Sequence, residues 1–156
     1  MTTERAEPTL GEAQARVRAD HVRIRSLLDE LGSLLTQQGP EGAATGSSKQ
    51  LAEAIWRLFL LLDDHLAMEE RDLAPLFERA GVWGKVQVQR LHEEHRQQRT
   101  TLLAMVDECD GKTKGESAIV DDARWLIESL RRDIDHEERE FDAVREDGFV
   151  VDQCTG

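Results

Sequence analysis

The amino-acid sequence predicts an all-α protein, specifically an antiparallel up-down-up-down four-helix bundle. Four long segments of the 156-residue chain carry apolar residues three and four positions apart, the spacing that lines one face of a helix. A cluster of glycine, proline or polar residues separates each segment from the next. The second connection, residues 81–84, is short, and short turns between long helices favour antiparallel neighbours.

The first helix is expected over residues 9–37, because Gly39 and Pro40 end the apolar pattern there. The loop that follows reaches Ser48, a residue type that often caps the start of a helix. The apolar stripe of this helix contains Leu10, Val17, Ile24, Leu28, Leu31 and Leu35.

The second helix is expected over residues 49–80, with a kink where Pro75 interrupts the backbone hydrogen bonding. The third is expected over residues 85–109 and the fourth, after a polar loop, over residues 117–144. The chain then divides into an N-terminal tail at residues 1–8, one domain at 9–146 and a C-terminal tail at 147–156.

Composition restricts the classes of partner. The formal net charge of -12 disfavours nucleic acid, because basic residues are scattered among acidic ones. No signal-peptide core is visible, and the longest apolar run, Leu58 to Leu62, is too short to span a membrane. Cys109 and Cys154 show no disulfide or redox spacing and are expected as reduced thiols. A soluble, cytoplasmic protein without a membrane partner is therefore expected.

All five histidines fall within the predicted helices. A lone helical histidine is more often a surface or hydrogen-bonded core residue than a metal ligand. Counted along each helix from the end carrying the first and third loops, however, all of them lie roughly 22 to 28 Å down, at about 1.5 Å per residue. They are His21, His65, His92, His95 and His136. Because four helices deliver imidazoles to one level, the sequence predicts a shared metal site.

The spacing His-x-x-x-Glu occurs twice, at His65 and Glu69 and again at His136 and Glu140. Residues four apart share one helix face, so the histidine can bind one metal while the glutamate, offset by about 5–6 Å, bridges to a second. A single such pair is commonly a solvated surface pair. Two copies, on the second and fourth helices and facing histidines of the first and third, predict a bimetallic site.

This arrangement resembles the hemerythrin-like family, also called HHE cation-binding domains, over residues 14–146. The acidic run from Glu69 to Pro75 is also similar to a run in that family. The resemblance implies that Glu69 and Glu140 bridge two metals. The implied metal ligands are His21, His65, Glu69, His95, His136 and Glu140.

Two positions depart from the oxygen-carrying hemerythrins. Their third helix has His-x-x-x-His, whereas this chain has His92-Glu-Glu-His95, in which His92 can replace the first histidine as a further ligand. The carboxylate on the fourth helix is also one residue nearer its histidine. Both departures count against simple reversible oxygen carriage.

The sequence gives weaker support for a role at the metal site to residues that neighbour the predicted ligands. Glu137 lies within the fourth apolar stripe and is either an extra ligand or one member of a salt bridge at the end of the site. Arg99 and Asp133 lie one turn from predicted ligands and are candidates for contacts behind them. Asp20, Asp64 and Asp135 each precede a histidine, and since adjacent helical positions point about 100° apart they are expected on the solvated surface.

Imidazole and carboxylate ligands suit iron without excluding manganese or zinc. The resemblance implies two iron ions, oxo- or hydroxo-bridged. The leading interpretation is a non-haem di-iron protein that binds or senses O2, NO or peroxide. Two alternatives stay open: a di-iron enzyme that decomposes peroxide or oxidises ferrous iron, and an iron-responsive regulatory bundle without catalysis.

Overall fold

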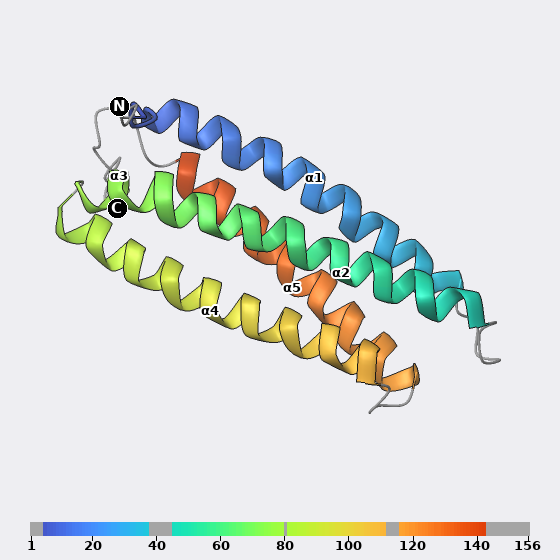
Figure 1. Cartoon of the computed structure of the whole chain (residues 1–156). Helices are drawn as coiled ribbons and strands as arrows, with labels where there is room; N and C mark the ends of the chain where they lie inside the picture. Colours follow the sequence, from blue (N-terminus) through green and yellow to red (C-terminus); the bar gives the residue numbers. More distant parts are fainter. Residues whose placement is uncertain (1–4, 38–44, 80, 112–115, 143–156) are drawn as a thin grey trace, which may run out of the picture.

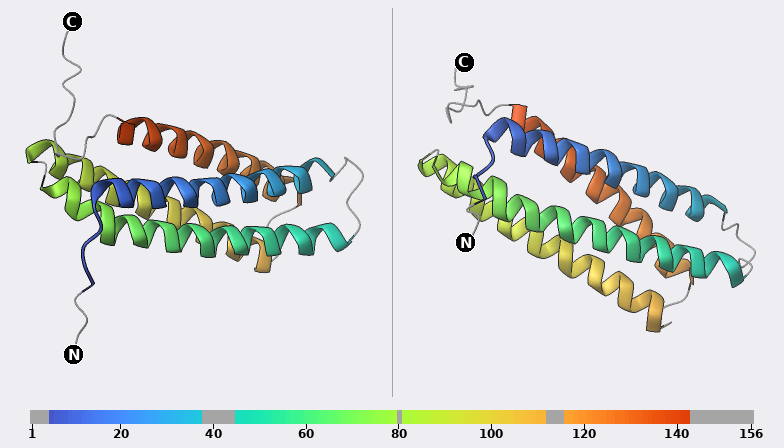
Figure 2. Two further views of the ribbon diagram at one scale, coloured as in Figure 1. Left: turned by 90° about the horizontal axis from the view of Figure 1, so that it is seen from above. Right: turned by 45° about the horizontal axis from the view of Figure 1, so that its top comes forward.

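The computed structural model describes residues 5–37, 45–79, 81–111 and 116–142. These residues form an all-α structure that contains no strand, which confirms the all-α part of the predicted fold class. Four long helices lie side by side in the views of Figures 1 and 2. Helix α1 packs against α2 and α5, and α4 packs against the same two helices. The long helices are α1 (Leu10–Gln37), α2 (Thr45–Met68), α4 (Val82–Gly111) and α5 (Glu116–Asp142).

Helix starts follow local chemistry. At α1, the Thr9 backbone N–H donates to Glu12 Oε2 at 3.0 Å and the Glu12 N–H donates to Thr9 Oγ1 at 3.2 Å, a reciprocal capping box. Helix α2 begins at Thr45, so Ser48 lies inside the helix and not ahead of it. Helix α4 begins at Val82, directly after Gly81, whose φ of 88° is a conformation that glycine tolerates best.

The second predicted helix is divided into three pieces. After α2 comes a π-helix, η1 (Glu69–Leu73), and then the short α3 (Ala74–Glu78), which has Pro75 in its first turn. The Ala74 backbone N–H bonds to the Glu69 carbonyl five residues back. Pro75 has no N–H to continue the α pattern, and its ring would clash with the carbonyl of Arg71. The expected disturbance is therefore present, but it begins at Glu69, six residues before the proline.

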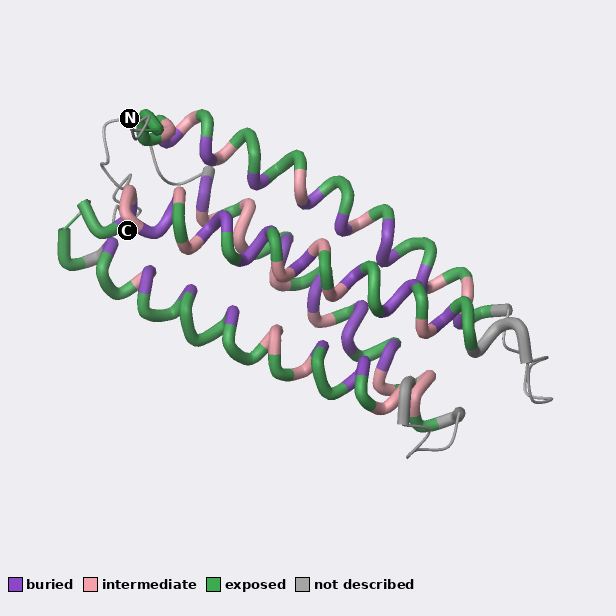
Figure 3. The backbone as a smooth tube through the Cα atoms, in the orientation of Figure 1, coloured by how far each residue is buried: buried purple, intermediate pink, exposed green. Residues whose placement is uncertain are grey.

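Buried apolar residues recur along the inner side of each long helix (Figure 3). They form two clusters. The larger apolar cluster includes Ile24, Leu28, Leu31, Leu35, Leu51, Ile55, Leu58, Leu62, Leu102, Leu126, Leu130 and Ile134. The smaller apolar cluster includes Leu10, Val17, Met68, Leu73, Phe77, Val88, Leu91 and Phe141. Along α1 and α4 the two clusters are separated by one buried histidine each, His21 and His95.

No helix in the parts of the chain that the structure describes is both long enough and apolar enough to cross a membrane. The predicted end of the fourth helix at 144, the C-terminal tail and Cys154 lie outside the described residues.

Candidate metal centre

Buried polar side chains form one layer between the two apolar clusters. His21 of α1, His65 of α2 and His95 of α4 are 1%, 3% and 2% exposed, and Glu69 at the start of η1 is fully buried. With Glu137 of α5 they make up what we call the histidine layer. Burying such groups costs free energy unless each finds a partner, so their contacts carry the functional argument.

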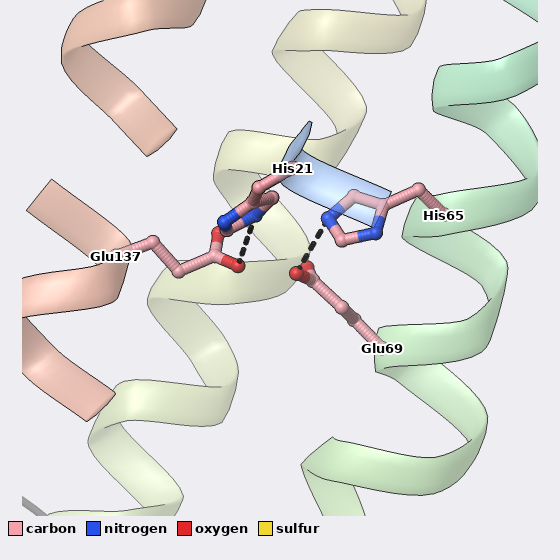
Figure 4. Close-up of side chains that lie close together, drawn as sticks. All are labelled: His21, His65, Glu69 and Glu137. Atoms are coloured by element: carbon pink, nitrogen blue, oxygen red, sulfur yellow. Dashed lines mark ion pairs between the residues drawn. The ribbon is translucent and has the colours of Figure 1, made fainter. Parts of the chain in front are cut away.

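The Nε2 atoms of the three histidines face carboxylates. His65 Nε2 lies 2.8 Å from Glu69 Oε1, and His95 Nε2 lies 2.8 Å from the other oxygen, Oε2. His21 Nε2 lies 3.3 Å from Glu137 Oε1. Figure 4 shows His21 with Glu137 and His65 with Glu69 as two adjoining pairs. The two oxygens of Glu69 therefore face histidines from different helices.

The opposite ring nitrogens are held by a second set of carboxylates. His21 Nδ1 lies 3.0 Å from Glu138 Oε1. His65 Nδ1 lies 3.2 Å from Asp20 Oδ2, and His95 Nδ1 lies 3.0 Å from Glu70 Oε1. An ionised carboxylate only accepts hydrogen bonds, so each Nδ1 is the donor. This arrangement fixes the ring orientation and leaves Nε2 as the atom that faces the layer, as in metal-binding histidines.

Two oxygens of the layer remain without a hydrogen bond within the described residues. Glu69 Oε1 and Glu137 Oε1 are buried, and neither makes one although a ring nitrogen lies close to each. Donor atoms of His21, His65, Glu69 and Glu137 all lie within 4.8 Å of one another. Orphaned carboxylate oxygens beside imidazole nitrogens are the donor set of a transition-metal site, so the residues fit a bound cation.

The two central carboxyls differ in protonation. Burial, together with the negative charge of Glu69 nearby, raises the pKa of Glu137 well above its usual value. Burial alone would also raise the pKa of Glu69, but its polar contacts with Glu137, His65 and His95 lower it below the usual value. Of the two carboxyls, Glu137 therefore retains a proton more readily and Glu69 ionises more readily.

The pKa values of His21 and His65 are shifted in opposite directions. Burial, reinforced by the neighbouring His65, lowers the pKa of His21 and keeps that imidazole neutral. For His65, burial has the same tendency, but the polar contacts and negative charges of Glu69 and Asp20 outweigh it and raise the pKa. The imidazole rings of His21 and His65 contact each other edge to face, with their centroids 4.9 Å apart.

The fourth-helix pair predicted from the sequence lies at the margin of this layer. His136 and Glu140 have side chains 51% and 37% exposed, with His136 Nε2 3.1 Å from Glu140 Oε1. Both line a small cavity of about 30 Å³ that also includes Glu94 and Glu137. The structure brings Glu137 into the compact donor group and leaves His136 and Glu140 outside it. Their ligation remains a prediction.

His92 lies further from the layer. Its side chain is 53% exposed, and its Nδ1 is 4.0 Å from Glu70 Oε1. His95, three residues later on α4, faces inward, and a three-residue step turns a helical side chain by about 60° from that direction. The structure does not bring His92 together with the other histidines, and its ligation likewise remains a prediction.

The residues behind the histidines were only partly foreseen. The expectation that Asp20 is solvated surface is wrong, because Asp20 is 16% exposed and holds His65 Nδ1. Asp64 and Asp135 are both exposed as expected, and Asp135 also pairs with Arg25. Arg99 does lie behind a histidine, since its Nη1 donates to Glu70 at 2.7 Å.

Glu70 and Glu138 were not singled out, although the sequence contains a signal for them. Each is the second residue of a Glu-Glu doublet, Glu69-Glu70 and Glu137-Glu138. The first glutamate of each doublet faces the histidine layer, and the second holds an Nδ1 atom. Asp133 accepts a hydrogen bond from Gln98 at 3.0 Å, and within the described residues no hydrogen bond or ion pair joins it to a histidine.

Comparison with protein families gives a match over residues 13–142 to the model described as the hemerythrin HHE cation binding domain. The match includes part or all of each of the four long helices and every histidine. Comparisons with curated proteins and with solved structures gave no match.

Proposed function

The chain belongs to the hemerythrin HHE cation-binding domain family, and on that premise we propose that it is a non-haem di-iron protein that binds or senses O2 or a related small molecule, NO or peroxide. The proposal includes the antiparallel up-down-up-down arrangement of the four helices. The packing of α1 and α4 each against both α2 and α5 supports it, as expected of a four-membered ring of helices. We also propose a cytoplasmic location.

One observation carries the dinuclear proposal. Glu69 directs Oε1 toward His65 and Oε2 toward His95, each at 2.8 Å, from a fully buried position. A carboxylate whose two oxygens face separate imidazoles is suited to bridge two metals. His21, His65 and Glu137 would hold one iron with Glu69 Oε1, and His95 would hold the other with Oε2. His136 and Glu140 are the candidates to complete the second position.

The bound irons would supply the electrons with which a diatomic or peroxide ligand interacts. The chain provides the surroundings. The apolar clusters on both sides of the histidine layer restrict water, and the three outer carboxylates keep the imidazoles oriented. The raised pKa of Glu137 favours a proton on that carboxyl beside Glu69, and Glu137 would have to release this proton to act as a ligand.

The proposal is tested by anaerobic reconstitution with ferrous iron. About two irons per chain are expected, with magnetic coupling between them and a near-ultraviolet charge-transfer absorption that develops on exposure to O2. A content near one iron, without coupling, would contradict the dinuclear site. Glu140→Gln and His136→Gln measured in the same way would show whether these two residues complete it.

Peroxide separates binding from catalysis. A binder should show a bounded spectral change after peroxide is added, without sustained gas release. Continued O2 evolution over many turnovers per iron would instead establish the peroxide-decomposing enzyme, and continued O2 consumption with added ferrous iron would establish the ferroxidase. Iron uptake without any response to O2, NO or peroxide would instead support the alternative of an iron-responsive regulatory protein without catalysis.

A further inference from the structure

The sequence spacing His-x-x-x-Arg occurs three times, always in the two helices that carry no His-x-x-x-Glu pair, and twice it begins at a buried histidine. His21 and Arg25 lie on α1, and His95 and Arg99 lie on α4. Residues four apart share one face of a helix. Each arginine is thus one turn from a buried histidine and on the same side.

On α1, histidine and arginine converge on one carboxylate of α5. Arg25 donates to both oxygens of Glu138, from Nη1 to Oε1 and from Nη2 to Oε2, each at 3.0 Å. The same Oε1 accepts the hydrogen bond from His21 Nδ1 at 3.0 Å. Arg25 Nη2 also contacts Asp135 Oδ1 at 2.8 Å, so two acidic residues of α5 fix the guanidinium.

On α4, the contacts repeat with different partners. Arg99 Nη1 and Nη2 donate to the two oxygens of Glu70 at 2.7 and 3.4 Å. Glu70 Oε1 also accepts from His95 Nδ1 at 3.0 Å, and Arg99 Nε donates to Asp63 at 3.0 Å. Each arginine therefore joins its own helix to a neighbouring segment through the carboxylate that orients a histidine.

We propose that Arg25 and Arg99 are positioning residues of the metal centre, with Arg25 fixing the histidine of one metal position and Arg99 that of the other. This inference rests on the proposed function. A two-pronged guanidinium contact prevents the glutamate from rotating away from Nδ1, and its charge offsets the added carboxylate behind the imidazole. The arginine and glutamate side chains are 27% to 35% exposed, so solvent screens these pairs less than it screens fully exposed ones.

His65 provides an internal contrast. Its Nδ1 partner is Asp20, and the arginine nearest to that carboxylate, Arg23, is 71% exposed and 4.0 Å away. The structure therefore assigns the arginine support to His21 and His95 and not to His65.

The experiment is a Co²⁺ titration of the full chain by calorimetry, with ligand-field absorption as a second readout. We expect Arg25→Gln and Arg99→Gln each to weaken one of the two binding steps by roughly 10- to 100-fold, the usual effect of losing a group behind a metal ligand. The matched control is Arg131→Gln, which removes an arginine that joins α5 to α1 through Asp29 at 2.6 Å but contacts no carboxylate of the histidine layer. It should leave both steps within about twofold of the wild type.

Conservative variants keep the test open if a glutamine variant does not fold. Arg25→Lys and Arg99→Lys retain the charge but not the fork, so each should weaken its step less than the glutamine variant and shift the ligand-field bands. Wild-type affinity in all four variants would overturn the positioning role while leaving the di-iron proposal intact. A wild-type protein that takes up no more than one Co²⁺ would instead contradict two metal positions, and with them the assignment of one arginine to each.

Discussion

The larger apolar cluster and the histidine layer are both buried within the same four helices, yet burial has different requirements in the two regions. In the cluster, side chains such as Leu28 and Leu58 are fully buried and need only close packing. In the layer, each histidine needs one carboxylate at each ring nitrogen, and two carboxylate oxygens still lack a hydrogen bond. The apolar cluster therefore contributes mainly to stability, whereas the layer presents donor atoms that could hold a cation.

This difference explains where the helical pattern breaks. Helix α2 runs regularly through the larger apolar cluster and becomes the π-helix η1 at Glu69, where the histidine layer begins. Single π turns are frequent at functional sites. Here the turn carries Glu69 and Glu70, which contact opposite nitrogens of His95 at 2.8 and 3.0 Å.

The largest loss of stability should follow a change in the larger apolar cluster. Leu58→Ala should lower the free energy of unfolding of the metal-free protein by about 2–5 kcal/mol, because it leaves a cavity among fully buried side chains. Urea denaturation measures this change. Leu60→Ala, on the same helix but at a side chain 48% exposed, is the control, with an expected change within about 0.5 kcal/mol. Metal affinity of the folded protein should be unaffected by either substitution.

Glu69→Gln should instead affect metal binding most. An amide cannot bridge two cations as a carboxylate does, so affinity for each metal should fall roughly 100-fold, about 2.7 kcal/mol, by calorimetry.

The metal-free Glu69→Gln variant should also be less stable than the metal-free parent at pH 7. The pKa of Glu69 is lower in the folded protein than in the unfolded chain, so ionised Glu69 stabilises the fold above its unfolded pKa, and this is lost as pH falls through the folded value. If the metal-free variant were more stable than its parent, the contacts of Glu69 would not offset the cost of burying its carboxylate.

A pair of substitutions on α4 sharpens the contrast between buried and exposed histidines. His95→Gln should weaken one metal-binding step roughly 10- to 100-fold, because it removes both a candidate ligand and the partner of Glu70. His92→Gln, at a side chain 53% exposed, should change affinity by less than about threefold, or 0.6 kcal/mol. Equal effects in a Co²⁺ titration would mean that metal binding draws His92 inward.

The smallest effect concerns pH. Because the pKa of Glu137 is raised in the metal-free protein, metal competes with a proton there, and apparent affinity should fall between pH 7 and pH 6 by no more than about tenfold for each proton displaced. His65, whose pKa is also raised, adds to the same trend because its protonated form cannot bind metal. Calorimetry in buffers of different ionisation enthalpy measures the released protons. Glu137→Gln should release fewer protons, and an unchanged number would exclude Glu137 as their source.

The sequence by itself determined the features that depend on one helix at a time. Apolar spacing identified all four long helices, and the His65 and Glu69 pair was assigned to one face because the geometry of residues four apart is local. A constant rise per residue was enough to expect His21, His65 and His95 at one level, where the structure has them buried together.

The tertiary structure decided how each helix is rotated about its axis. On α5, that rotation directs Glu137 to the donor group and leaves His136 half exposed, whereas the sequence favoured Glu140 over Glu137. On α4 it separates His92 from His95. The partners of the Nδ1 atoms were likewise undetermined, because Asp20, Glu70 and Glu138 contact histidines that belong to other helices. Packing between helices sets these rotations, and no spacing within a single helix encodes them.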